Sequence, residues 1–156
     1  MSFARASRAW MVSILTCMGV TAVWMAASSV ATGRSGPVWH NVVDLSLAFG
    51  SAYALTATIV FLPAFAVLTM VSARLLTPIA AAAVGAALGP LALVAFVLLF
   101  PETESPQAVS EWLRYWTTHP ADTAIGSLPF VIAGAVFGWS WARSENAVTA
   151  VRRASI

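Results

Sequence analysis

The feature that most constrains this chain is an uncharged run from Thr77 to Pro101, TPIAAAAVGAALGPLALVAFVLLFP. It is longer than the ~20 apolar residues that a helix needs to cross a bilayer. Three further uncharged runs, at 9–33, 45–73 and 123–142, accompany it. Because lipid offers no hydrogen bonds, such segments cross it as helices whose backbone groups pair internally. The sequence therefore predicts an all-α integral membrane protein, a single membrane domain (residues 1–156) built as a four-transmembrane-helix bundle.

Composition argues against a water-soluble domain. Of the 156 residues, 60% are hydrophobic and 9% are charged, whereas soluble domains carry about 25% charged residues. The net charge of +2 is too small to favour nucleic acid, so the expected partner is the lipid bilayer. All eight basic residues are arginines, which we attribute, with the abundant alanine, to a GC-rich genome. We predict a multi-pass protein of a bacterial cytoplasmic (inner) membrane.

Local signals place the helix ends. The predicted transmembrane helices cover about 10–31, 46–72, 78–100 and 123–142, and the remaining residues 143–156 are expected to form a partly disordered cytoplasmic tail. Thr77 followed by Pro78 is typical of a helix start, with threonine as the N-cap and proline in the first turn. Pro63 and Pro90 lie inside predicted helices and should kink them.

Two expectations concern the connections around these helices. The very short link at Arg74 predicts that the second and third helices form a tight antiparallel hairpin.

The first apolar segment also resembles a signal peptide, with Ser29-Val30-Ala31 as a small-x-small cleavage site, although its apolar stretch exceeds the usual ~7–15 residues. Retention and cleavage of this segment stay open as alternatives.

A short amphipathic helix is predicted at about 106–117, between the third and fourth membrane helices. Val109, Trp112, Leu113 and Trp116 follow one another at i, i+3, i+4 and i+7, which is the spacing of one helical face. Aromatic side chains favour the boundary between lipid and water. We therefore expect this helix to lie on the surface of the cytoplasmic membrane that faces away from the cytoplasm.

Charge predicts the orientation. Six arginines lie on the side of the predicted bundle that holds both termini: Arg5, Arg8, Arg74, Arg143, Arg152 and Arg153. The opposite side holds Arg34 and Arg114. Because arginine-rich segments stay in the cytoplasm, both termini are predicted to be cytoplasmic, an N-in/C-in topology.

Two glycine pairs predict close helix packing. The third helix carries Gly85 and Gly89, and the fourth carries Gly134 and Gly138, each pair with the G-x-x-x-G spacing. Such glycines let two membrane helices approach until their backbones touch. We expect these faces to pack the helices of this chain on each other. The alternative is that one face points outward and docks another membrane subunit or a second copy.

One polar cluster is expected outside the membrane. His40 and Asp44 lie at i, i+4 and share a face if they are helical, and His119 and Asp122 precede the fourth helix on the same side. The four side chains are candidate metal ligands, and the two histidines are candidate haem ligands. Neither spacing matches a recognised site, so we predict no metal and no cofactor and keep these roles as alternatives.

The sequence carries no sign of catalysis. No ionisable residue lies in the middle of a predicted membrane helix, where pumps and proton-coupled transporters place one. Phosphate-binding loops, zinc-protease motifs and paired cysteines are absent, and Cys17 is the single cysteine. We expect a non-enzymatic accessory or assembly subunit that acts through helix–helix contacts. The alternatives are a small oligomeric transporter or channel lined by hydroxyls of the second helix, such as Ser51 and Thr56, and a haem- or metal-binding redox subunit.

Overall fold

A computed structural model describes residues 3–31, 38–72, 77–99 and 107–154 of the chain. Every regular element in these ranges is helical. Four segments are long and apolar enough to cross a membrane: Ala6–Ser29, Asn41–Met70, Pro78–Ala95 and Pro120–Arg143. An all-helical chain with four helices of membrane-crossing length, as predicted, is thereby confirmed.

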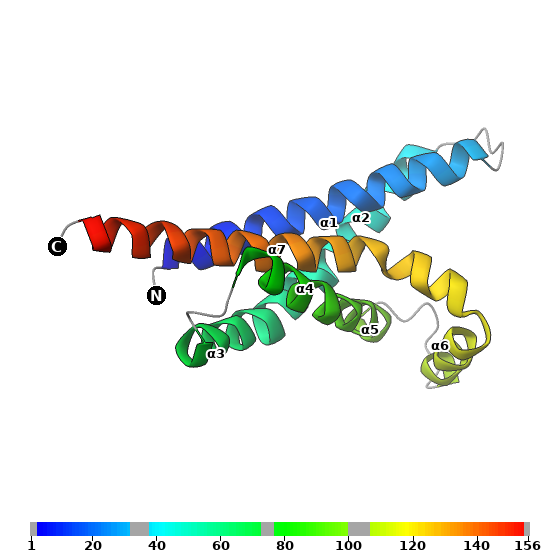
Figure 1. Cartoon of the computed structure of the whole chain (residues 1–156). Coiled ribbons are helices and arrows are strands. Elements are labelled where there is room, and N and C mark those ends of the chain that lie inside the picture. Colours follow the sequence, from blue (N-terminus) through cyan, green and yellow to red (C-terminus); the bar gives the residue numbers. More distant parts are fainter. Residues whose placement is uncertain (1–2, 32–37, 73–76, 100–106, 155–156) are drawn as a thin grey trace.

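The helices follow one another along the chain as α1 (Phe3–Ala31), α2 (Val38–Thr56), the π-helix η1 (Ala57–Phe61), α3 (Leu62–Ser72), α4 (Pro78–Leu88), α5 (Pro90–Leu99), α6 (Gln107–Thr118) and α7 (Pro120–Ala154). Helix α7 organises the bundle because it packs along both α1 and α4, while α2 packs on α1 and α5. Figure 1 shows the two termini at one end of the bundle and α6 at the other.

Several helices extend past their predicted ends. Helix α1 begins at Phe3 rather than near residue 10, and α2 begins at Val38 rather than near residue 46. The tail expected to be partly disordered is instead helical as far as Ala154. Residues 143–154 contain neither glycine nor proline, so nothing in their backbone stops the helix after it leaves the apolar segment. The expected N-cap is confirmed, since the Thr77 hydroxyl accepts a hydrogen bond from the Ala80 N–H at 3.2 Å.

The two predicted kinks take different forms. Proline removes one N–H and excludes the carbonyl four residues earlier. Before Pro63, the chain widens into the π-helical turn η1, and the N–H of Leu62 bonds to the carbonyl of Ala57. Before Pro90, the N–H of Gly89 bonds to the carbonyls of both Gly85 and Ala86, at 3.0 and 3.2 Å. The carbonyl that Pro90 excludes is therefore satisfied by its neighbour, and the helix divides into α4 and α5.

The core is a column of aromatic rings between α7 and the α2–η1–α3 segment. Phe61 stands edge-on to both Tyr53 and Phe137, with ring centroids 5.7 and 5.5 Å apart. Phe65 contacts Phe137 at 5.3 Å and Trp141 at 5.8 Å. These separations and angles are the favourable ones for aromatic pairs. The second and third membrane-length segments pack on each other through α2 and α5, whereas the link at 73–76, on which the expected tight hairpin depends, lies outside the described residues.

Candidate functional site

The two glycine pairs lie against each other at the crossing of α4 and α7. A methyl group added to Gly85 would overlap the carbonyl oxygen of Gly134, and one added to Gly134 would overlap that of Gly85. A methyl group at Gly89 would lie 2.5 Å from the carbonyl oxygen of Phe130, and one at Gly138 would overlap that of Ala81. All four glycines are buried. Both faces are thus occupied within this chain, and neither is left open for a partner helix.

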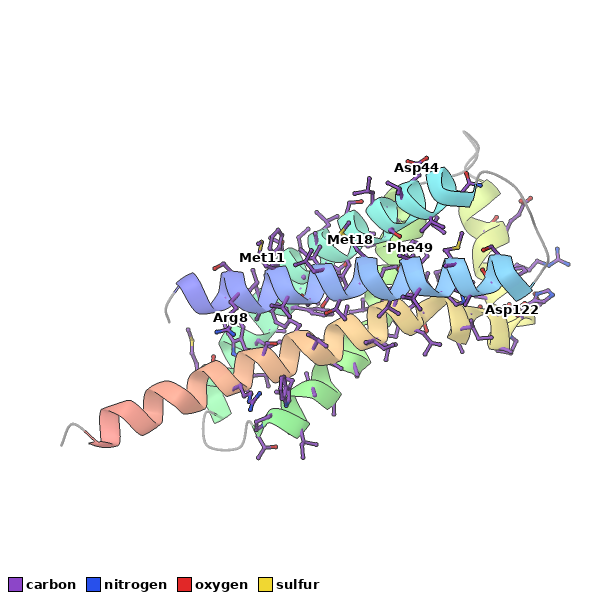
Figure 2. The ribbon with its side chains drawn as sticks, turned by 90° about the horizontal axis from the view of Figure 1, so that it is seen from above. Arg8, Met11, Met18, Asp44, Phe49 and Asp122 are labelled. Atoms are coloured by element: carbon purple, nitrogen blue, oxygen red, sulfur yellow. The ribbon has the colours of Figure 1, made fainter. Side chains whose placement is uncertain are left out.

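The predicted outer cluster is divided between two places. His119 is the single residue between α6 and α7, and Asp122 lies in the first turn of α7. His40 and Asp44 lie in α2, where the Asp44 side chain is exposed and the His40 side chain lies outside the described residues. Figure 2 shows Asp44 and Asp122 on separate helices at the same end of the bundle. Among the described side chains, no three His, Cys, Asp or Glu groups converge as metal ligands.

Side-chain contacts shape the corner between α6 and α7. The Tyr115 hydroxyl donates to the Asp122 carboxylate at 3.1 Å, and the Tyr115 ring stacks on the His119 imidazole with centroids 4.4 Å apart. The Thr118 hydroxyl lies 2.9 Å from the imidazole Nδ1 of His119. The hydrogen bond to Asp122 raises the pKa of Tyr115 above its ordinary value of 10.0. These contacts connect α6 to the start of α7.

A second polar feature lies inside the bundle, at the interface of α1 and α2. Its members are buried and point inward from the two helices: Ser13, Cys17 and Thr21 from α1, and Ser46, Tyr53 and Thr56 from α2. The Cys17 thiol lies 3.9 Å from the carbonyl oxygen of Phe49. Figure 2 shows Met18 and Phe49 near each other where the two helices run side by side. We call these six residues the interior polar stripe.

The hydroxyls expected to line a channel are split between two faces of the second membrane segment. Ser46, Tyr53 and Thr56 are buried in the interior polar stripe. Ser51 and Thr58 are exposed, and their hydroxyls donate to the carbonyls of Ala48 and Ala54; the Thr58 hydroxyl also accepts from the Trp10 indole of α1. Back-bonding of this kind is the ordinary way in which membrane helices satisfy hydroxyls. Any polar path along this segment would therefore face α1.

Two buried hydroxyls of the stripe, those of Ser46 and Tyr53, have different surroundings. The Ser46 hydroxyl has no hydrogen-bond partner among the described residues, and the Ser46 and Tyr53 side chains are only 6% and 0% exposed. Ser13 is a hydrogen-bonding neighbour of the Tyr53 hydroxyl, and Cys17 is a second polar neighbour. An unpaired buried hydroxyl is uncommon in proteins and calls for a physical explanation.

Comparison with known proteins identifies no relative: the chain matches no protein-family model, no curated protein and no solved structure. Sequence reasoning named the glycines, but it missed the contact of Tyr115 with Asp122 and the aromatic column. The spacing of Phe61 and Phe65 at i, i+4 was an available signal for the column, because these positions share one helical face.

Proposed function

We propose that this chain is a non-enzymatic integral membrane protein with both termini in the cytoplasm and α6 on the outer surface. Figure 1 supports this topology, because both termini lie at the end of the bundle opposite α6. Figure 2 shows Arg8 at one end and Asp44 and Asp122 at the other. Arginine near the cytoplasmic ends of membrane helices is the strongest determinant of orientation.

We further propose that the protein is an accessory or assembly subunit that binds its partner through α6. The observation that carries this proposal is the polar face of α6, which exposes Glu111, Arg114, Tyr115 and Thr117 at the edge of the bundle. The glycine faces, the other candidate contact surface, are occupied inside the chain. A surface of mixed charge beside aromatic side chains is suited to binding another protein at the membrane surface.

Co-purification tests the subunit role. Tagged full-length protein, isolated from its native membrane in mild detergent, should bring a stoichiometric partner that mass spectrometry identifies. The double variant Glu111→Ala/Arg114→Ala should lose this partner while remaining monodisperse. Asp44→Asn, a change of an exposed side chain at the same end of the bundle, should keep it. Recovery of the chain alone, or equal recovery of the partner with both variants, would count against α6 as the contact surface.

Thiol labelling tests the topology separately. Cys17 is buried, so a Cys17→Ser background removes the only native thiol with little change at the surface. A cysteine at exposed Thr117 should react with a membrane-impermeant maleimide in intact cells. A cysteine appended after Ile156 should react only once the membrane is permeabilised. If the cysteine after Ile156 reacted in intact cells and the cysteine at position 117 reacted only after permeabilisation, the proposed topology with cytoplasmic termini would be refuted.

A further inference from the structure

The exposed side of α7 carries an apolar row of side chains. Its members are 40–47% exposed, and their spacing places them on one face of the helix: Ile125, Leu128, Ile132 and Trp139. The opposite side of α7 is buried and holds the glycines that contact α4. Because all four side chains lie in the membrane-length segment Pro120–Arg143, lipid is the surface that suits this row.

Arg143 ends this row, one helical turn after Trp139. Its guanidinium carbon lies over the Trp139 ring, 4.4 Å from the ring centroid, in a cation–π contact. Both side chains are exposed. Arg143 is also the last residue of the membrane-length segment. The contact therefore holds a positive charge beside an apolar surface, at the end of the segment where lipid headgroups meet water.

The Arg143 guanidinium has unused hydrogen-bond donors. Among the side chains that the structure describes, no carboxylate pairs with Arg143, and its contact is the Trp139 ring. The N–H groups of a guanidinium lie in its plane, so a ring beneath that plane leaves them free to donate. Their fork matches two oxygens of a phosphate group. The site thus offers donors and a positive charge to an anion.

We propose that Arg143 and Trp139 bind the phosphate headgroup of an anionic phospholipid, with an acyl chain lying along the apolar row of α7. Ile132 lies roughly 16 Å along the helix axis from Arg143, at ~1.5 Å per residue. This distance is about half of the ~30 Å hydrocarbon core. The row from Trp139 to Ile132 therefore spans the depth of one leaflet, which is the depth that the chain of such a lipid reaches.

Charge selects the class of lipid. With no described carboxylate beside Arg143, the site carries a net positive charge that an anionic headgroup neutralises and a zwitterionic headgroup does not. The inference rests on the proposed insertion of the chain in a membrane. It does not depend on which end of the bundle is cytoplasmic, because anionic and zwitterionic lipids can be supplied to both ends in detergent.

Native mass spectrometry tests the inference on the full chain. The protein, purified in mild detergent, is mixed with equimolar phosphatidylglycerol and phosphatidylcholine that have identical acyl chains. Wild type should retain severalfold more phosphatidylglycerol than phosphatidylcholine, and Arg143→Gln should bring this ratio close to one. Because Arg143 is exposed, its replacement disturbs no buried packing. Equal retention of the two lipids by the wild type would overturn the inference.

Arg8 is the matched control for positive charge. It is an exposed arginine at the end of the bundle that holds the termini, and no described ring contacts it. Arg8→Gln should keep the preference for phosphatidylglycerol. Equal loss with Arg8→Gln and Arg143→Gln would show attraction to the total charge of the protein and would overturn the site.

Two further measurements test the tryptophan and the apolar row. Trp139→Leu keeps an apolar side chain but removes the ring under Arg143, so it should lower the lipid ratio severalfold; an unchanged ratio would overturn the role of Trp139. Excess glycerol 3-phosphate, which lacks acyl chains, should leave the bound lipid in place. Displacement of the lipid by this soluble phosphate would show a site for the anion alone and would overturn the proposed lipid site.

The lipid site and the proposed function fail in different experiments. Reversed thiol labelling would refute the topology and leave the lipid ratio unchanged. Loss of lipid preference would refute the site at Arg143 and leave co-purification through α6 unchanged.

Discussion

Replacing Gly134 by alanine should separate α4 from α7. The added methyl group would overlap the carbonyl oxygen of Gly85, and it would lie 2.8 Å from the Gly85 carbonyl carbon and 3.4 Å from the Phe61 ring. The Gly85 atoms belong to the backbone, so no rotation of a side chain can relieve the contact. The helices must move apart, and every other contact along this crossing then lengthens.

The required movement sets the expected cost. Even at Gly89, the mildest of the four contacts, the gap to the Phe130 oxygen would have to widen from 2.5 Å to at least 3.4 Å. Overpacking of a filled interior typically costs about 1–3 kcal/mol. We therefore expect Gly89→Ala to lose about 1–3 kcal/mol of unfolding free energy and Gly134→Ala to lose about 3 kcal/mol, the upper end of that range.

Gly19 is the matched control, because it lies within the first membrane-crossing segment and an added methyl group there meets nothing within 4 Å. Surface substitutions usually change stability by less than about 0.5 kcal/mol, so Gly19→Ala should unfold with the wild type. Reversible unfolding in mixed micelles of mild detergent and dodecyl sulfate measures both variants. Equal stability of Gly134→Ala and Gly19→Ala would refute the glycine contact between α4 and α7.

Two further predictions concern the helix ends. Thr77→Ala removes the side-chain acceptor of the Ala80 N–H and should lower the unfolding free energy by about 1 kcal/mol in the same assay, whereas Thr77→Ser should keep most of it. At the α6–α7 corner, the hydrogen bond from Tyr115 to Asp122 raises the pKa of the phenol above 10.0. The stability that this hydrogen bond contributes is therefore complete below pH 10.0 and is lost as the pH rises through the raised pKa. In a Tyr53→Phe background, Tyr115 is the only tyrosine, so tyrosinate absorbance should report the raised titration midpoint of Tyr115. Asp122→Asn should return this midpoint toward 10.0. A midpoint that Asp122→Asn leaves unchanged would refute Asp122 as the cause.

The four helices of membrane-crossing length could be predicted because lipid imposes a simple rule, namely that an uncharged run of sufficient length becomes a helix. The ends of these helices could not be predicted from the same signal. Hydropathy reports where the chain meets lipid, whereas backbone hydrogen bonding continues into polar sequence until a breaker stops it. Helix α7 shows the difference, since it passes Arg143 and remains helical to Ala154. Thr77 was predictable because its capping role depends only on adjacent residues.

The two prolines show a similar limit. Sequence indicates that Pro63 and Pro90 disturb a helix, but not how the lost hydrogen bond is replaced. At Pro63, a wide turn keeps Phe61 and Phe65 directed at α7, where both contact Phe137. At Pro90, the adjacent Gly89 is already pressed against α7, and its N–H takes the freed carbonyl. The form of each disturbance therefore follows from tertiary packing, which a local pattern does not contain.

The same reasoning explains why the contact surfaces were ambiguous. A G-x-x-x-G pattern indicates that the backbone of another helix can approach the glycine face closely, but it does not identify that helix. The structure pairs Gly85 with Gly134 inside one chain, so these residues are assigned to stability and not to recognition. Polar groups that the fold leaves exposed are then the better guide to function, namely those on the outer face of α6. Variants of the exposed face of α6 should therefore affect binding without affecting stability, whereas variants of the buried glycines should affect stability first.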